Sequence, residues 1–265
     1  MPKINTRQEY DAIKALNYSG AKELLKSPAH YQAWLNEPRK ETPALAIGTA
    51  VHAEILQPQI ASEIYAVAPD VDRRTKDGKS QWESFVTQNT GKAIITHDQQ
   101  KTVCNVATAA LNALTANGIS FDATEVMTYH ESIIPLKFAI DAVGSDGYLY
   151  DIKTTEDATP RGFKSSAISY KYYLQAFFYY QCYWWATKVK PAGFRFIVVE
   201  KNPPYAVAIY ELGPTLMQWG ADDFNKAIDL YKKCTDAGEW PGFPNDPQVI
   251  DVEAKTTTAT PITFA

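Results

Sequence analysis

The sequence predicts a mixed α/β domain with a helical N-terminal portion. Helical apolar patterns dominate residues 19–117, whereas residues 124–154 contain three β-rich runs. Helix and strand patterns then alternate as far as residue 237. Because 45% of the 265 residues are apolar and 12% are aromatic, the chain can bury a large core, which excludes a disordered protein.

The N-terminal portion is expected to consist mainly of helices. Ser19 is expected to cap a short helix, and Pro28 permits a second helix to begin there. A longer helix over residues 44–57 should stop before Pro58. The other elements predicted in this portion are a strand at 63–68, a charged loop at 73–79, and helices at 80–89 and 97–117.

The second portion is expected to build the main sheet. The sequence GSDG at 144–147 predicts a hairpin turn, and Asn202-Pro203-Pro204 predicts another turn. Residues 251–265 are Thr-rich and lack the composition of a core, so we expect one domain over 1–250 followed by a flexible tail. The predicted elements are strands at 124–135, 136–144, 148–154, 194–200 and 206–212, and helices at 169–187 and 215–237.

The net charge of −4 limits the ways in which this chain can handle nucleic acid. A protein that coats DNA passively is usually basic, so any positive charge that serves DNA must be local here. Two groups of cations could contact phosphates, although a run of charges is more often a solvated surface. These groups are Arg73, Arg74, Lys76 and Lys79, and then Arg161, Lys164 and Lys171.

Cysteine content and hydropathy indicate the cellular compartment in which we expect this protein. The three cysteines, Cys104, Cys182 and Cys234, form no CxxC pair, which suits a reducing cytoplasm and cannot supply the four thiolates of an iron–sulfur cluster. The most apolar segment, 172–186, is interrupted by glutamines and too short to span a bilayer, so it predicts a buried helix. The polar first residues show no signal-peptide core, and we expect a cytoplasmic protein without membrane contact.

The segment FAIDAVGSDGYLYDIKTTED, residues 138–157, carries the candidate chemistry. Asp151 and Lys153 lie two apart on one strand and therefore share a face. A three-residue loop with left-handed Gly147 would place Asp141 directly opposite Asp151. Two facing carboxylates repel unless a cation lies between them, and hard oxygen ligands suit Mg²⁺. The alternative is a polar hairpin with an exposed Asp–Lys pair, and spacing alone does not separate the two.

This segment resembles the motif of the PD-(D/E)XK nucleases. The helix containing Gly48 and His52 resembles the GxxxH element of the RecB-type branch, and the stretch from Gln175 to Tyr179 resembles its QxxxY element. The segments SGAKELLKSPAHYQAW and GEWPGFP resemble the RecE exonuclease domain (exonuclease VIII) and its phage relatives. The resemblance runs from about residue 19 to 244 and implies a PD-(D/E)XK core, with a mixed central sheet flanked by helices.

The resemblance also implies a metal site. His52, Asp141 and Asp151 would bind the catalytic Mg²⁺, with the main-chain carbonyl of Ile152 as a further ligand. Because imidazole is a softer ligand than carboxylate, Mn²⁺ is expected to substitute. Without the resemblance, a histidine on an apolar helix is more often a hydrogen-bonded core residue.

Three further residues receive roles from the resemblance. Lys153 would activate the attacking water. Gln175 and Tyr179, one helical turn apart, would border the site and touch the DNA strand or order Lys153. Packing is the alternative explanation for both in so aromatic a helix.

Other acidic and histidine residues are assigned no role. Glu125 and Glu131, on the strand before Asp141, could approach the metal, but solvated strand positions are the preferred interpretation. His30, His97 and His130 match none of the motifs.

The implied activity is that of an exonuclease on linear double-stranded DNA. Degradation of one strand from the 5′ end, a ring-shaped homo-oligomer (a tetramer), and a RecT-type single-strand annealing partner in DNA recombination all follow from the family. One alternative is a RecB-like nuclease that acts on single strands, flaps or internal sites. Another is a catalytically silent DNA-binding module, although such a module need not retain Asp141, Asp151 and Lys153 together.

Overall fold

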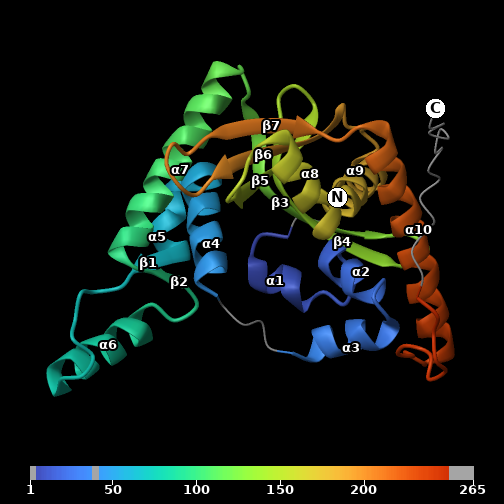
Figure 1. Cartoon of the computed structure of the whole chain (residues 1–265), viewed down its shortest axis with the longest axis horizontal. Helices are drawn as coiled ribbons and strands as arrows, with labels where there is room; N and C mark the ends of the chain where they lie inside the picture. The colour runs from blue at the N-terminus through green and yellow to red at the C-terminus, as the bar shows by residue number, and fades with distance from the viewer. Residues whose placement is uncertain (1–3, 38–41, 251–265) are drawn as a thin grey trace, which may run out of the picture.

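A five-stranded mixed sheet forms the centre of the molecule in the computed structural model, which describes residues 4–37 and 42–250 (Figure 1). The strand order is β3-β4-β5-β6-β7. Neighbouring strands run antiparallel except β5 and β6, which are parallel and are linked through helices. Helices cover both faces of the sheet, so the predicted mixed α/β fold is confirmed.

The five strands predicted for the second portion are all present, but β3 begins three residues and ends four residues before its predicted bounds, because residues 132–134 form the connection to β4. A separate two-stranded parallel sheet lies beside α4 and α7, and its second strand was not predicted because three residues show too little alternation. The main-sheet strands are β3 (Phe121–Glu131), β4 (Pro135–Gly144), β5 (Tyr148–Thr155), β6 (Gly193–Glu200) and β7 (Val207–Glu211), and the small sheet consists of β1 (Tyr65–Val67) and β2 (Ala93–Ile95).

The helices depart from prediction at several ends. The cap of α2 is Asn17, whose side-chain oxygen accepts from the Gly20 N–H, and not Ser19, which lies inside the helix. The helices are α1 (Arg7–Ala12), α2 (Tyr18–Leu24), α3 (Pro28–Asn36), α4 (Pro43–Leu56), α5 (Ala61–Ile64), α6 (Lys76–Gln88), α7 (His97–Ala116), α8 (Pro160–Ser169), α9 (Tyr172–Thr187) and α10 (Pro214–Ala237), with a 3₁₀ turn at Pro58–Ile60.

Two helix corrections affect functional segments. The predicted charged loop at 73–79 is loop only at its start, because Thr75 caps α6 and the helix begins at Lys76. Helix α8 was missed, although Thr159 followed by Pro160 is a cap followed by a proline at the first helical position. Among the described residues, no helix has the length and apolar character needed to span a bilayer.

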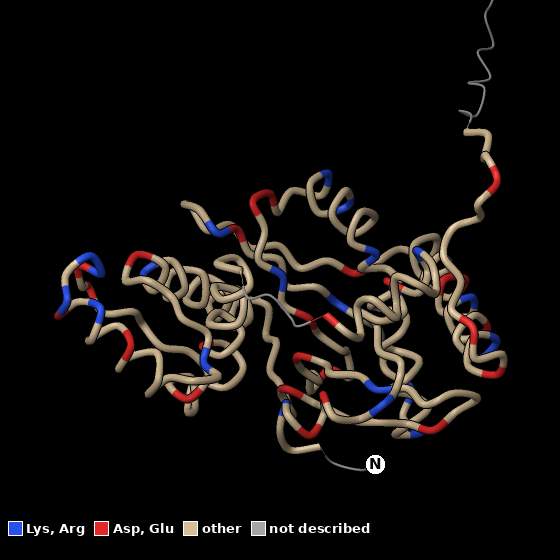
Figure 2. The backbone as a smooth tube through the Cα atoms, turned by 90° about the horizontal axis from the view of Figure 1, so that it is seen from below, with Lys and Arg blue, Asp and Glu red and all other residues tan. Residues whose placement is uncertain are grey.

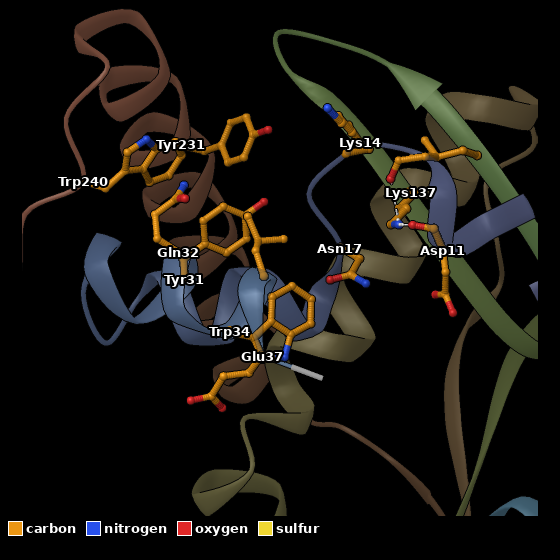
Figure 3. Close-up of a pocket in the computed structure, with 13 residues that line it drawn as sticks. Asp11, Lys14, Asn17, Tyr31, Gln32, Trp34, Glu37, Lys137, Tyr231 and Trp240 are labelled. Carbon is orange, nitrogen blue, oxygen red and sulfur yellow. Dashed lines mark hydrogen bonds between the residues drawn. The ribbon is translucent and has the colours of Figure 1, made fainter. Parts of the chain in front are cut away.

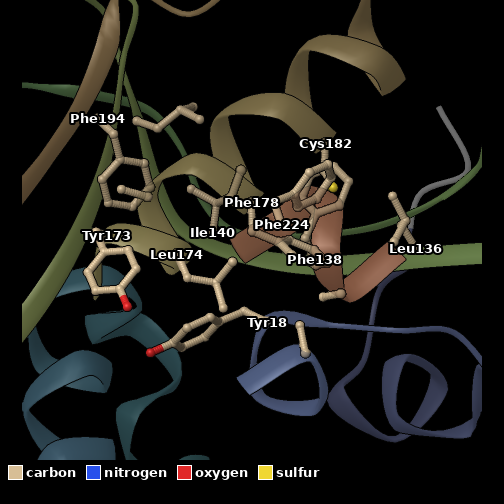
Figure 4. Close-up of a cluster of buried hydrophobic side chains, with 14 of the residues drawn as sticks. Tyr18, Leu136, Phe138, Ile140, Tyr173, Leu174, Phe178, Cys182, Phe194 and Phe224 are labelled. Atoms are coloured by element: carbon tan, nitrogen blue, oxygen red, sulfur yellow. The ribbon is translucent and has the colours of Figure 1, made fainter. Parts of the chain in front are cut away.

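Side chains alternate across β5 and thereby divide the core in two. Leu149 packs into an aromatic cluster with α9 and α10, part of which Figure 4 shows, including Phe178, Phe194 and Phe224. Tyr150 and Ile152 pack on the opposite side with the aliphatic residues of α4 and α7. Asp151, between them, therefore points toward α9.

The N-terminal segment is fastened to β4 by a buried lysine. Lys137 is 6% exposed, and its Nζ donates to the carbonyl oxygens of Tyr10, Asp11 and Ile13 at 2.9, 3.2 and 2.8 Å. Figure 3 shows Lys137 beside a cavity of about 500 Å³, opposite aromatic side chains of α3 and the α10 region. An ammonium group carries three N–H donors, which matches these three main-chain acceptors. The centre of the Tyr10 ring also lies 4.8 Å from Lys137 Nζ.

Candidate active site

The hairpin between β4 and β5 has the predicted register. Gly147 is left-handed (φ +79°), and its N–H donates to the Gly144 carbonyl at 2.9 Å. The pairs Ala142–Tyr150 and Val143–Leu149 follow the turn, and the next position sets Asp141 opposite Asp151. The backbone ladder between the two strands ends there. Instead, the Asp141 carboxylate accepts the Ile152 N–H at 2.7 Å.

Helix α4 brings His52 to this point. His52 Nδ1 lies 3.5 Å from the Asp141 carboxylate, and its Nε2 lies 3.0 Å from the Ile152 carbonyl oxygen. One imidazole therefore contacts both the side chain of one strand and the main chain of the next. The family resemblance implied that His52, Asp141 and Ile152 belong to one metal site, and the structure brings these three residues together.

Glu125 on β3 completes the cluster, contrary to the expected solvated position. Its neighbours Thr124 and Val126 pair with Ala142 and Ile140, which flank Asp141, so Glu125 lies opposite Asp141. Glu125 has a left-handed φ of +49° and is only half-exposed. Burial, together with the Asp141 charge, raises the pKa of Glu125 to about 7. Glu131, in contrast, is exposed as predicted.

Asp151 is the most deeply buried acid of the site, at 2% exposure. Its Oδ1 accepts from Gln175 Nε2 at 2.5 Å, and its Oδ2 lies 2.6 Å from Lys153 Nζ. Burial raises the pKa of Asp151 to about 6, because desolvation and the Asp141 charge outweigh the attraction of Lys153. The carboxyl group is therefore sensitive to any cation that enters the site.

Lys153 lies over an aromatic ring beside Asp151. Its Nζ is 4.7 Å from the centre of the Tyr172 ring, a cation–π contact. Burial acts to lower the pKa of Lys153, but the negative charge of Asp151 outweighs it and raises that pKa above its ordinary value. Lys153 is therefore an ammonium cation at neutral pH.

Helix α9 places Gln175 and Tyr179 differently from one another. Gln175 is buried at 4% exposure and holds Asp151, so it orders Lys153 through their shared carboxylate. Tyr179 packs edge-on against Tyr18 at 6.3 Å and lies 6.2 Å from Phe194. In this structure Gln175 contacts the candidate active site through Asp151, and Tyr179 packs among aromatic rings beside the site.

The donor set fits a divalent cation. One ligand atom from each of His52, Glu125 and Asp141 lies within 4.8 Å of the other two. Carboxylate oxygens suit hard cations, and the imidazole admits transition metals. Burial and then the Asp141 charge raise the pKa of Glu125, while His52 and Arg7 act to lower it. A bound cation would add to this stabilisation of the ionised carboxylate. Asp151, predicted to be a ligand, lies outside this triple and contacts Lys153 and Gln175.

The two basic groups predicted from the sequence differ in how many of their members are exposed. Arg73, Arg74, Lys76 and Lys79 are all exposed near the start of α6, on the arm at the left of Figure 2. Arg74 pairs with Asp72 at 3.0 Å. In the second group, Lys171 is bound to Asp223 at 2.6 Å, whereas Arg161 and Lys164 are exposed on α8. Lys171 is thus a structural cation, contrary to the grouping from sequence.

Comparisons with known proteins identify a family and a fold for this chain. Residues 17–250 match the family described as a PDDEXK-like domain of unknown function (DUF3799). A solved structure from Eubacterium rectale, described as a candidate exonuclease, is similar over 98% of this chain and 100% of its own, with a TM-score of 0.61 and 13% identity. An alkaline exonuclease from Laribacter hongkongensis matches 69% of this chain and 96% of its own, with a TM-score of 0.31 and 14% identity.

At 13% identity, the likeness to the Eubacterium rectale structure establishes the fold alone. No curated protein sequence matches this chain. The family match is the broader finding, because it spans the whole sheet and every candidate site residue from His52 to Tyr179. The chain therefore belongs to the PDDEXK-like family.

Proposed function

We propose that this protein is a divalent-metal-dependent exonuclease that degrades one strand of linear double-stranded DNA. The observation that carries the proposal is the meeting of His52, Glu125 and Asp141 beside the Asp151–Lys153 ion pair. These residues lie where the backbone hydrogen bonds between β4 and β5 end. At this point the Asp141 carboxylate, and not a main-chain carbonyl, accepts the Ile152 N–H. Family membership supports a nuclease as the activity of such a site.

Asp141, Glu125 and His52 would hold the cation, with Asp151 and the Ile152 carbonyl next to them. A carboxylate has about four lone-pair positions, so the present partners of Asp151 leave room for a further one. When bound, Mg²⁺ supplies Lewis-acid stabilisation of phosphate oxygens and lowers the pKa of a coordinated water. Mn²⁺ is expected to substitute, because the set contains an imidazole.

Lys153 acts as a hydrogen-bond donor in this proposal. Its raised pKa keeps it protonated, which makes it a poor base but a good partner for the negative charge that develops on the attacked phosphate. Asp151 and the ring of Tyr172 fix the ammonium position, and Gln175 fixes Asp151. The same ammonium can orient the attacking water by donating a hydrogen bond to the water oxygen, and it takes no proton from that water.

The finer assignment rests on the resemblance to RecE-type exonucleases. It supports attack from the 5′ end, a ring-shaped homotetramer, and a RecT-type annealing protein as partner in recombination. Nothing about in-line attack on a phosphodiester requires a DNA end. The requirement for an end therefore comes from assembly and access to the site.

Linear and covalently closed circular duplexes of the same sequence, incubated with Mg²⁺, test the proposal. We expect the linear form to be resected and the circle to survive, and Asp151→Asn to leave both intact. Cutting of the circle at a comparable rate would replace the proposal with the RecB-like alternative, in which internal sites are cut. Failure to cut either form with Mg²⁺ or Mn²⁺ would favour the silent DNA-binding module.

A further inference from the structure

A second, smaller cavity adjoins the candidate active site. Its volume is about 270 Å³, and Lys153 forms part of its wall. From there it extends past the C-terminal end of β5 to the junction of α8 and α9, where Ser166, Tyr170 and Tyr172 line it. The cavity thus leads directly away from the ammonium group that we assign to the chemistry.

Two tyrosines form an aromatic path from solvent to Lys153. The Tyr170 and Tyr172 rings stack with centres 5.6 Å apart and planes inclined by 30°. Tyr172 in turn lies beneath Lys153 Nζ, as described above. Tyr170 forms the outer end of the path, with 56% of its surface exposed. A large aromatic ring kept exposed at the mouth of a pocket is available to a flat ligand.

The backbone at this junction is built to bring the two rings together. Residues two apart on one helix do not face each other, so the stack requires a break between α8 and α9. Lys171 makes the break with a left-handed φ of +57°, and its side chain is tied to Asp223 at 2.6 Å. The Tyr170 carbonyl also accepts from the Tyr18 hydroxyl at 2.7 Å. The main chain that carries the exposed Tyr170 ring is therefore held in place on both sides.

The charges of the pocket balance one another. Lys153 is paired with Asp151, and Lys201 is paired with Glu156 at 2.6 Å. Asp157 also lines the pocket, where its carboxylate accepts the Thr159 N–H at 2.8 Å. A phosphate here would meet the carboxylates of Glu156 and Asp157, and both lysines of the wall are already in ion pairs. An uncharged ring would instead meet aromatic faces and hydroxyl groups. The chemistry therefore favours a nucleobase over a phosphate.

We infer that this pocket receives a base of the strand being cut, next to the scissile phosphate, with Tyr170 as its stacking platform. The inference rests on the proposed nuclease function and adds a substrate contact to it. Stacking on a tyrosine face tolerates any base, so it would position the strand without imposing sequence preference. Tyr170 would position the DNA strand by stacking on a base, and Lys153 would stabilise the charge on the phosphate during cleavage.

The test combines protein variants with base deletion in the DNA. Wild type, Tyr170→Ala and Tyr170→Phe would be assayed on linear duplexes that carry one abasic site at the first, second or third nucleotide of the cut strand. On intact DNA we expect Tyr170→Ala to raise KM about tenfold with a smaller change in kcat, and Tyr170→Phe to behave as wild type. At one abasic position wild type and Tyr170→Ala should become equal. Because the ring is exposed, both variants should keep the wild-type melting temperature.

Two results would overturn the inference: wild-type constants for Tyr170→Ala on every substrate, or a Tyr170→Ala penalty that no abasic position removes. The second result would mean that Tyr170 acts on the structure and not on a base.

A binding measurement separates this inference from the proposed function. Single 2-aminopurine residues near the end of the cut strand report stacking by a loss of fluorescence, without any cleavage. We expect quenching with wild type and Tyr170→Phe in EDTA, and its loss with Tyr170→Ala. If wild type cleaves no DNA but shows this pattern, the proposed function fails and the pocket stands. If DNA is cleaved but quenching is absent or independent of Tyr170, the pocket assignment fails alone.

Discussion

Two lysines of the central sheet are shielded from solvent in different ways. Lys137 on β4 places its ammonium among three main-chain carbonyls at 2.8 to 3.2 Å, and 4.8 Å from the centre of the Tyr10 ring. Lys153 on β5 has one oxygen partner among the described residues, Asp151 at 2.6 Å, and otherwise lies over the Tyr172 ring. The first environment uses all three N–H donors to fasten the N-terminal segment, whereas the second leaves donors for a substrate.

The contrast shows that shielding alone does not identify a catalytic lysine. Three neutral carbonyl oxygens solvate the Lys137 ammonium and offset the cost of its burial. At Lys153 the partner is itself an acid with a raised pKa, and further acids and a histidine lie next to it. Perturbed acids gathered around a cation indicate function more strongly than a satisfied cation does.

The largest effect is expected from neutralising Lys153. Lys153→Met keeps the packing over Tyr172 but removes the charge, so cleavage of linear duplex should fall by about a thousandfold or more. Asp151→Asn should reduce cleavage to a similar extent, because it removes the carboxylate that holds Lys153. The fold should persist, because the asparagine side-chain oxygen can still accept from Gln175. Cleavage rates and DNA affinity would be measured together, and we expect affinity and melting temperature to change little. Wild-type-like cleavage by either variant would remove Asp151 and Lys153 from the active site.

Lys137→Met should show the opposite pattern. The substitution leaves three carbonyl oxygens without their donor, and water can reach them through the neighbouring cavity. We expect a loss of about 2–3 kcal/mol of unfolding free energy with cleavage per folded molecule retained. Urea unfolding and active-site titration would measure the two quantities. A Lys137→Met protein of normal stability would contradict the anchoring role.

Metal binding should depend on pH and release protons. The pKa values of Glu125 and Asp151 are raised to about 7 and about 6, so both hold protons at pH values where unfolded carboxyls are ionised. Metal-free protein should therefore lose this contribution to stability as pH rises through 6 and 7, while metal affinity rises. Calorimetry in buffers of different ionisation enthalpy should show release of about one proton at pH 6 and less at pH 8. Equal proton release at both values would count against the site.

The smallest effect is expected from the C-terminal tail. Residues 251–265, predicted to be flexible, lie outside the described residues. Removing the chain from Glu253 onward should leave cleavage rate and melting temperature unchanged, because its composition cannot contribute to a core. A truncated protein that neither folds nor cleaves would show that the tail belongs to the domain.

Local patterns placed Asp141, Asp151 and Lys153 together on one predicted hairpin, and the resemblance assigned them to a metal site. Contacts between distant parts of the chain could not be predicted in this way. Strand alternation and the GSDG turn suffice to predict the hairpin register, which the pairs Ala142–Tyr150 and Val143–Leu149 confirm, since both rules act within one hairpin. Glu125 could not be assigned in the same way. Its approach to Asp141 depends on the pairing of β3 with β4 and on a left-handed backbone that glutamate rarely adopts.

The same limit explains errors in the fold. The five main strands and the long helices follow from periodicity, whereas β2 is too short to show any. Lys171 was grouped with Arg161 and Lys164 because they are near in sequence. Its ion pair is with Asp223, on a helix that arrives much later in the chain.

The location of bound Mn²⁺ tests the central claim most directly. Crystals of the protein grown or soaked with Mn²⁺ would be measured at a wavelength where manganese scatters anomalously. The account predicts an anomalous peak in contact with the carboxylates of Asp141 and Glu125, beside His52 and within reach of Asp151. An ordered Mn²⁺ bound only elsewhere, or none at these carboxylates at saturating concentration, would contradict the assignment of this cluster as the metal centre.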